Sequence, residues 1–364
     1  MATTMILLST LGGLGLLLFG MRMMTEGLQA AAGQSIRGIL NQVSSNRVLG
    51  CLTGTVVTAV IQSSSATTVM LVGLVGAGLM NLYQAVGVIL GANIGTTVTA
   101  QLIAFDLGKL ALPAIALGVG LRFFAVKKRI RSFGDIVLGF GILFLGLTVM
   151  KDSLLPLRSN PQFVAFFTRF GVDTLGQTLM CVGVGTILTI LIQSSAATIG
   201  LTMTLAGQGL IDFPTAMALV LGENIGTTIT AQLSTIGSNA EAHQVANAHT
   251  LFNIMGVMLT ILFFPFFVKG VVFCTQILGL SSDVAGVPNE NINRYIANGH
   301  TLFNIVNALF FLLIMPWLVK ITQLLSPRET EDKDLLVLPQ FSDLLQDNPL
   351  AAVAKIRASK ITPK

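Results

Sequence analysis

Two short polar motifs stand between long apolar stretches of this sequence. The first reads QSSSATT over residues 62–68, and the second reads QSSAAT over residues 193–198. Each is followed by another polar motif, GANIGTT from residue 91 and GENIGTT from residue 222. Hydroxyl and amide side chains donate and accept hydrogen bonds, and their neutral oxygens are ligands that a hard cation can use. These residue types predict a binding site for a small anion, a small cation or both.

The stretches around the motifs are apolar enough to lie in a membrane. Of 364 residues, 53% are hydrophobic and 10% are charged, against about 25% charged in a soluble domain. Apolar runs of about 20 residues, the length that crosses a bilayer, recur along the chain. The net charge of +5 lies in loops and in the C-terminal region. It suits contact with anionic lipid rather than nucleic acid, so the sequence predicts an integral membrane protein.

The chain repeats itself. The Gln-Ser motifs at residues 62 and 193 and the Asn-Ile-Gly motifs at residues 91 and 222 recur at one and the same offset. In addition, LFGMRMMTEGL at residue 18 resembles FLGLTVMKDSL at residue 144. The chain is therefore expected to consist of two related halves, residues 1–130 and 131–270. A separate duplication follows, with ANAHTLFNI at residue 246 and ANGHTLFNI at residue 297.

Three kinds of membrane segment are expected. The arms of the first Gln-Ser motif have 12–14 apolar residues, about 20 Å of helix, which is too short for a core about 30 Å thick. They predict re-entrant hairpins at 48–80 and 178–210. The Gly-x-Asn-Ile-Gly stretches predict discontinuous helices at 84–104 and 214–235. Unbroken spanning helices are expected at 5–25, 107–126, 133–150, 243–268 and 298–320.

An odd number of crossings in each half would invert the second half relative to the first. The basic residues Lys127, Lys128, Arg129 and Arg131 are expected in the cytoplasm, with the N-terminus outside and the C-terminus inside. The predicted fold class is an all-α polytopic membrane protein with two inverted-topology repeats, each holding a re-entrant helical hairpin and a discontinuous transmembrane helix. Residues 271–322 are expected to form an extracellular loop and a final transmembrane helix.

Interrupted segments at matching places in two inverted halves point to a transporter site near the membrane midplane. Each hairpin tip begins a helix, whose free N–H groups and dipole favour an anion. No Lys or Arg lies in or beside these motifs in the sequence. A multiply charged anion would then need accompanying cations, which predicts Na⁺-coupled symport of an oxyanion.

Glu223 stands in the second GENIGTT motif where the first half has Ala92. A carboxylate at membrane depth is a functional candidate, either as a cation ligand or as a proton carrier. The alternative is a structural role, in which it faces a wet vestibule or pairs with a backbone amide. His249 and His300 lie in matching HTLFN contexts and are expected to be interhelical hydrogen-bonding residues rather than ligands.

The paired QSSSATT and QSSAAT motifs, each followed by GANIGTT or GENIGTT, resemble the duplicated signature of the sodium/phosphate cotransporter family. The resemblance covers about residues 5–320 and implies Na⁺-driven uptake of inorganic phosphate across the plasma membrane by alternating access. It implies phosphate contacts at Gln62, Ser63, Ser64, Ser65, Gln193, Ser194 and Ser195. It implies sodium ligands at or near Gln62, Ser65, Asn93, Thr96, Thr97, Gln193, Thr198, Glu223, Asn224, Thr227 and Thr228.

Two features depart from the simplest form of this family. Ala196 stands where the first motif has Ser65, so the two tips offer different numbers of hydroxyls. Residues 323–364 are expected to be a cytoplasmic linker followed by a stub, at 341–360, that resembles the beginning of a phosphate-uptake-regulator-like helical domain. The expected partners are phosphate, sodium ions and membrane lipid, and a homodimer is one candidate assembly.

Two other functions stay open. The same architecture could carry a carboxylate or sulfate, and the regulator-like stub suits a membrane phosphate sensor. An enzyme is not expected, because the sequence holds no nucleophile elbow, no paired acids and no metal-ligand cluster, and GANIGTT lacks the lysine of a phosphate-binding P-loop.

Overall fold

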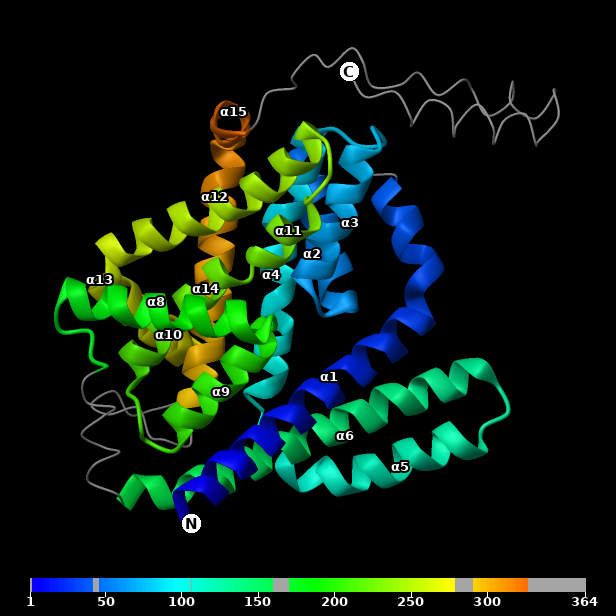
Figure 1. Ribbon diagram of the computed structural model, residues 1–364, viewed down its shortest axis with the longest axis vertical. Coiled ribbons are helices and arrows are strands. Elements are labelled where there is room, and N and C mark those ends of the chain that lie inside the picture. Colours follow the sequence, from blue (N-terminus) through cyan, green and yellow to red (C-terminus); the bar gives the residue numbers. More distant parts are fainter. Residues whose placement is uncertain (1, 42–45, 106, 160–169, 279–290, 327–364) are drawn as a thin grey trace, which may run out of the picture. The chain divides into compact units, whose positions relative to one another are not determined.

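The computed structural model describes residues 2–41, 46–105, 107–159, 170–278 and 291–326. Every regular element in these residues is a helix (Figure 1), as the predicted all-α class requires. The chain divides into two units, residues 1–327 and 328–364, and all described residues lie in the first. The regulator-like stub and the predicted linker beyond residue 326 lie outside the described residues, whereas residues 323–325, expected in the linker, belong to a helix.

Six described helical segments are long and apolar enough to cross a membrane, which makes the chain a multi-pass membrane protein. They are Thr4–Ala31, Leu82–Ile103, Lys128–Leu157, Leu175–Ile192, Ala240–Leu262 and Ile292–Leu313.

The helices of the first half are α1 (Ala2–Asn41), α2 (Arg47–Ile61), α3 (Ser64–Gly76), α4 (Leu82–Ile103) and α5 (Ala111–Phe124), with a 3₁₀ turn, η1 (Gly108–Leu110), before α5. The second half has α6 (Lys128–Leu154), η2 (Leu155–Ser159), α8 (Leu175–Ile192), α9 (Ser195–Gly207), α10 (Phe213–Gly226) and α11 (Ile229–Ser234). The chain continues with α12 (Ala240–Leu262), α13 (Phe264–Ile277), α14 (Ile292–Leu313) and α15 (Met315–Leu325).

The first expected discontinuous helix is wrong. α4 runs without a break from Leu82 to Ile103, because its glycines serve close packing and do not end the helix. A Cβ on Gly91 would lie 1.8 Å from the carbonyl oxygen of Cys51, and one on Gly95 would lie 2.5 Å from that of Thr55. Only glycine lets α2 and α4 approach this closely.

The second half does contain an interruption, just after its Gly-x-Asn-Ile-Gly stretch. α10 ends at Gly226 and α11 begins at Ile229. The two threonines between them direct their hydroxyls to nearby carbonyls, Thr227 to Glu223 and Thr228 to Ile225, both at 2.8 Å. Such bonds compete with the regular helical ladder. The halves therefore differ at equivalent places.

Three of the expected spanning helices also need correction. The helix expected at 107–126 is α5, which has only 14 residues, or about 21 Å. Helix length therefore no longer supports the expected three crossings in each half. The segments 243–268 and 298–320 each divide in two, at Phe263 and Ile314. Pro265 and Pro316, at matching places in the later duplication, stand at the start of α13 and α15, because proline cannot continue the preceding helical ladder. Residues 271–277, expected in a loop, belong to α13.

α1 and α6 pack side by side through glycines (Figure 1). A Cβ on Gly13 would lie 2.8 Å from the carbonyl oxygen of Gly146, and one on Gly20 would lie 2.6 Å from that of Gly139. The contacts run in opposite residue order along the two helices, so the pair is antiparallel. Small residues at such contacts are typical of helices packed in membranes.

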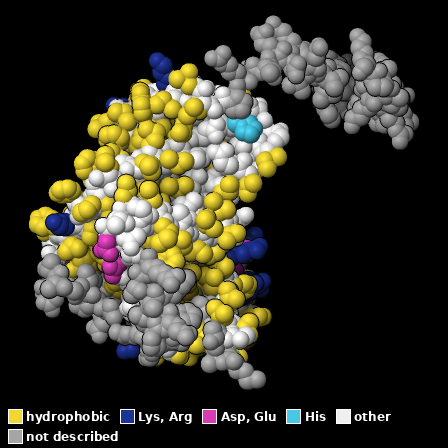
Figure 2. All heavy atoms as spheres, turned by 60° about the vertical axis from the view of Figure 1, so that its left-hand side comes forward, with side chains coloured by type: hydrophobic (Ala, Val, Ile, Leu, Met, Phe, Trp, Pro, Cys, Tyr) yellow, Lys and Arg dark blue, Asp and Glu magenta, His cyan; other side chains and the backbone are white. Residues whose placement is uncertain are grey.

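The outer surface is rich in apolar side chains. Figure 2 shows hydrophobic side chains over much of the face that it draws, with Lys and Arg in a few places. Leu112, Phe123 and Phe266 are among the large apolar residues that are more than 65% exposed. Exposed apolar surface of this extent suits contact with lipid.

Candidate functional site

The two Gln-Ser motifs form matching tips between short helices. Gln62 is the C-cap of α2 and Gln193 is the C-cap of α8, with φ of 58° and 55°. They are the only non-glycine residues with positive φ in the described parts of the chain. Each tip N–H bonds back 2.7 Å to a threonine carbonyl, that of Thr58 or Thr189. A left-handed non-glycine residue costs about 1–3 kcal/mol, and such strain is concentrated at functional sites.

The serines that follow begin the next helices. Ser63 and Ser194 are extended, and their hydroxyl oxygens accept hydrogen bonds from the N–H groups of Ala66 at 3.1 Å and Ala197 at 3.3 Å. Both serines, predicted as phosphate ligands, therefore act as helix N-caps. Each hydroxyl still has its own proton to donate.

Threonine pairs hold the arms of each tip together. The hydroxyls of Thr58 and Thr67 lie 2.9 Å apart, and those of Thr189 and Thr198 lie 3.2 Å apart. Thr198, predicted as a sodium ligand, is 1% exposed and is committed to this contact. The bond recurs at equivalent positions of the two halves, so both tips are built in the same way.

The tips of the two halves meet at one small cavity of about 10 Å³, room for about one water molecule. It lies among α4, α9, α10, α14 and the first tip. Its lining residues are Gln62, Thr96, Thr99, Ala100, Ser195, Ala196, Ile199, Glu223 and His300. The structure therefore brings together four predicted ligands, Gln62, Thr96, Ser195 and Glu223.

Hydrogen bonds fix part of the cavity wall. Thr99 donates its hydroxyl proton to Oε1 of Gln62 at 2.7 Å, and Thr96 donates to the hydroxyl of Ser64 at 3.1 Å. The Nε2 amide of Gln62 donates to the carbonyl of Ala59. These bonds orient Gln62 although it sits at a strained turn.

Two other lining residues have polar atoms without a hydrogen-bond partner. Glu223 and His300 are each 1% exposed. Oε2 of Glu223 and both ring nitrogens of His300 are buried without a hydrogen-bond partner. An unpartnered buried polar atom costs about 1–3 kcal/mol, so these atoms are candidates for contact with a ligand.

The remaining predicted ligands do not line the cavity. Asn93 and Asn224 donate their amides to carbonyls of their own helices, those of Ile89 at 2.9 Å and Val220 at 2.8 Å. Thr97 donates to the carbonyl of Ile94 at 2.8 Å. The predicted ligands outside the lining are Ser63, Ser64, Ser65, Asn93, Thr97, Gln193, Ser194, Thr198, Asn224, Thr227 and Thr228.

Sequence reasoning missed Thr99 and set His300 aside. It also missed two matching sets of hydrogen bonds, here called clamps, in which one glutamine binds two side chains of another helix. Gln101 donates to Asn298 and Thr301 on α14, both at 3.0 Å, and Gln232 donates to Asn247 at 3.1 Å and Thr250 at 2.8 Å on α12. The signal was present, because the glutamines stand at equivalent positions of the two halves and their partners at equivalent positions of the later duplication.

An arginine also reaches the first clamp, although none stands beside the motifs in the sequence. Arg294 donates to Oε1 of Gln101 at 3.3 Å and lies 3.7 Å from the centre of the Phe105 ring. It is not among the residues that line the cavity. The cavity lining itself contains no Lys or Arg.

The donor set of the cavity suits an alkali cation better than a transition metal. It offers one carboxylate and several neutral oxygens, which hard cations use. No cluster of three or more His, Cys, Asp or Glu that could hold a metal occurs among the residues that the structure describes.

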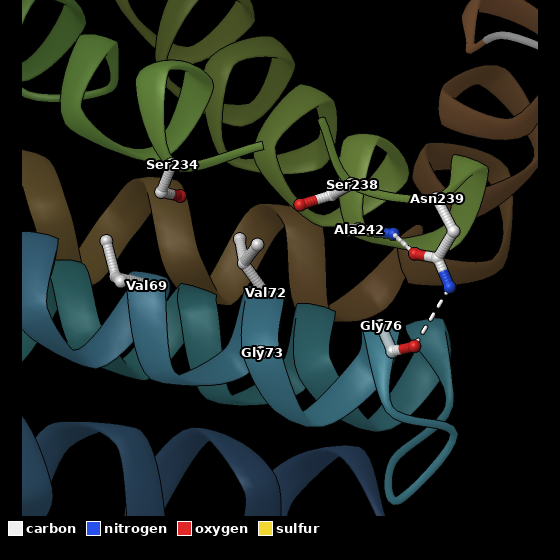
Figure 3. A pocket seen from close by; sticks show the side chains of 8 residues that line it. All are labelled: Val69, Val72, Gly73, Gly76, Ser234, Ser238, Asn239 and Ala242. Atoms are coloured by element: carbon white, nitrogen blue, oxygen red, sulfur yellow. Dashed lines mark hydrogen bonds between the residues drawn. The ribbon is translucent and has the colours of Figure 1, made fainter. Parts of the chain in front are cut away.

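A second, larger hollow of about 440 Å³ lies between α3 and the segment that joins α11 to α12. Figure 3 shows Val69, Val72, Gly73 and Gly76 on the α3 side, facing Ser234, Ser238, Asn239 and Ala242. One hydrogen bond, 2.9 Å long, joins the amide of Asn239 to the carbonyl of Gly76.

Comparison with known proteins gives consistent matches. The sequence profile of the Na⁺/Pi-cotransporter family matches residues 16–152 and 167–280. The uncharacterized protein YqeW of Bacillus subtilis is 31% identical over 313 residues, 85% of this chain and 95% of YqeW. YjbB of Escherichia coli K12, named "Putative inorganic phosphate export protein", is 28% identical over 351 residues, which are 96% of this chain but 61% of YjbB.

A shorter match links the chain to animal proteins. The rat sodium-dependent phosphate transport protein 2A is 36% identical over 96 residues, 26% of this chain and 15% of that protein. No solved structure gave a significant match.

Proposed function

Since the chain belongs to the Na⁺/Pi-cotransporter family, which is a family of transporters and not of enzymes, we propose that it carries inorganic phosphate across a membrane. In this proposal sodium is the coupling ion, and access to the site alternates between the two faces. One observation carries the proposal: Gln62 of the first tip and Ser195 of the second tip line the same buried cavity.

The anion would be held by the helix that begins at the second tip. Ser195 is the first residue of α9 and Ser194 is its N-cap, so unpaired N–H groups and the positive end of the helix dipole face this region. The matching start of α3, at Ser64, gives the first tip the same character. Neutral donors of this kind can hold phosphate without a lysine or arginine.

The coupling cation would balance the charges. Glu223 is buried in the cavity, whose lining contains no Lys or Arg, and phosphate brings further negative charge. A buried charge without compensation is strongly destabilising. Sodium near Glu223, Oε1 of Gln62 and the Thr96 hydroxyl would supply the missing positive charge.

Inversion of the two halves is part of the proposal and is supported by α1 and α6. When residue 18 is aligned with residue 144, Gly13 corresponds to Gly139 and Gly20 to Gly146. Gly13 contacts Gly146 and Gly20 contacts Gly139, so each glycine meets the counterpart of the other. This is the self-complementary pattern of a twofold axis, and for an antiparallel spanning pair such an axis lies in the membrane plane.

The short arms support re-entrant tips. α2, α3 and α9 have 15, 13 and 13 residues, about 20 Å each. α8, at 18 residues, is long enough to cross by length alone. The proposal includes the halves 1–130 and 131–270. It also places the segment 127–131, with its four basic residues, on the cytoplasmic face of the plasma membrane.

Export is a second candidate for the direction of net phosphate transport. The printed name of YjbB refers to phosphate export, whereas the rat relative is named as a sodium-dependent transporter. Uptake of carboxylate or sulfate, and phosphate sensing without flux, are the remaining alternatives.

Radiolabelled phosphate flux in liposomes that hold the purified protein separates these functions. We expect influx that follows an inward sodium gradient, efflux when the gradient is reversed, and no stimulation by potassium. Competition by excess arsenate but not succinate would support phosphate as the substrate. Phosphate binding without gradient-driven flux would instead support a sensor.

A further inference from the structure

His300 is buried in the cavity with polar atoms that no protein group satisfies. It lies on α14, is 1% exposed, and both of its ring nitrogens lack a partner. Glu223 lines the same cavity, yet His300 makes no hydrogen bond to it. Buried polar atoms are nearly always hydrogen-bonded, so a purely packing role would leave two of them unsatisfied.

Several other lining side chains are already committed. Thr99 donates to Gln62, Gln62 donates to Ala59, and Thr96 donates to Ser64. His300 and Glu223 therefore stand out as polar lining groups that have buried atoms without a partner. The neutral imidazole of His300 offers both a donor and an acceptor.

A hydrogen-bond donor beside a hydrogen-bond acceptor matches the groups of a hydrogen phosphate ion. A phosphoryl oxygen accepts a hydrogen bond, and the P–OH group of the same ion donates one. Sulfate at neutral pH offers acceptors only, so it would leave the acceptor nitrogen of His300 unsatisfied. A site built to bond a ligand hydroxyl discriminates strongly against an analogue that lacks it.

The chain provides a matched histidine outside the cavity. His249 stands in the same HTLFN context on α12, is fully buried, and also has two unpartnered ring nitrogens. It is not among the residues that line the cavity, and the position equivalent to Glu223 in the first half is Ala92.

We propose that His300 is a direct ligand of the transported phosphate when the cavity, which here has room for about one water molecule, widens to admit it, and that His300 helps the site to select phosphate over sulfate. The inference rests on the proposed function, because it names a residue of the same site. His249 is not a phosphate ligand in this arrangement.

Phosphate uptake by His300→Phe, His300→Gln and His249→Phe tests the role. Phenylalanine keeps a ring but cannot hydrogen-bond, so His300→Phe should raise KM for phosphate about tenfold or more, because a hydrogen bond to a charged ligand is lost. It should also increase inhibition by sulfate relative to arsenate. His300→Gln, which has a donor and an acceptor, should recover part of the affinity, and His249→Phe should leave KM within about twofold.

A measurement on the unaltered protein removes dependence on the folding of the variants. The chain has three histidines, His243, His249 and His300. With ¹⁵N-labelled histidine and bound inorganic phosphate, solid-state NMR should show a ring ¹⁵N to ³¹P dipolar coupling that persists in His249→Phe and is lost in His300→Phe.

Two results would overturn the inference and leave the proposed function intact. One is wild-type phosphate flux without a ¹⁵N–³¹P coupling. The other is an unchanged KM and sulfate preference in a folded His300→Phe protein. Absence of phosphate flux and phosphate binding in the wild type would overturn both.

Discussion

At the scale of single residues, the site depends on side chains that hold one another in place. Gln62 occupies a left-handed conformation, and its amide is fixed by bonds to Thr99 and Ala59. Thr99 lies outside the polar motifs, so its role follows only from the packing of α4 against the tip. The geometry of Gln62 therefore depends on a residue that sequence reasoning had no reason to select.

Replacing Thr99 with Val should weaken phosphate transport without unfolding the protein. The change removes the bond to Gln62 and keeps the shape of the side chain, and one such bond contributes about 0.5–1.5 kcal/mol. We expect KM for phosphate to rise about two- to tenfold. Thr230→Val, at the equivalent position of the second half, is the control; an equal effect of both changes would argue against an orienting role for Thr99.

Replacing Glu223 with Gln should affect sodium more than phosphate. The amide keeps the volume of the carboxylate but cannot balance a cation, so half-saturation by sodium should require about tenfold more sodium, or ~1.4 kcal/mol. Sodium titration of phosphate uptake measures this. Glu241→Gln, which alters another carboxylate with a buried, unpartnered oxygen, should leave the sodium dependence unchanged.

Sequence reasoning found part of this site for a physical reason. Gln62, Ser195 and Glu223 lie in local motifs whose duplication is visible in the chain. His300 comes from a distant helix, and its sequence context differs from that of His249 only in Gly299, which stands where the earlier copy has Ala248. Only the three-dimensional packing distinguishes a histidine that lines the cavity from one that does not.

At the scale of elements, glycine determines how the helices approach. A Cβ at Gly91 would lie 1.8 Å from the Cys51 oxygen, and one at Gly222 would lie 1.9 Å from the Val182 oxygen. The same Gly-x-Asn-Ile-Gly pattern suits a broken helix or a close helix pair, so the sequence alone could not choose between them. Pro265 and Pro316 are a clear local signal for the two helix breaks, but single helices were expected at both places.

Gly91→Ala should destabilise the protein, because backbone atoms of α2 would have to move. Overpacking of this kind costs about 1–3 kcal/mol, which should lower the apparent Tm in detergent by several degrees. Gly120→Ala in α5 is the control, since its Cβ would have nothing within 4 Å, and its Tm should stay the same or rise. Equal Tm values for the two variants would mean that the α2–α4 contact can relax.

At the scale of the whole described unit, the two halves differ although their tips match. The second half has the interruption at Thr227 and Thr228 and the carboxylate of Glu223, whereas α4 is continuous and carries Ala92. The repeat could be predicted from the sequence because the motifs recur in register. The number of crossings stays a prediction, because α5 is a helix of 14 residues within an apolar stretch of spanning length.

Single cysteines at Asn81 and Asp212 test inversion. These residues are the N-caps of α4 and α10 and correspond to each other when Gln62 is aligned with Gln193. In a background without the three native cysteines, an impermeant thiol reagent should label them from opposite faces of the membrane. Ser238, in the segment that contacts the end of α3, should label from the same face as Asn81. Labelling of Asn81 and Asp212 from one face would refute inversion.

The crossing of α12 and α14 has a consequence for the origin of the chain. A Cβ on Gly256 would lie 2.2 Å from the Asn307 amide, and these two residues are counterparts when His249 is aligned with His300. Gln101 binds the later copy and Gln232 the earlier one. Each half thus binds one copy of the later duplication. Both copies follow α11 in the chain, so the chain did not arise by a simple end-to-end joining of two equal copies.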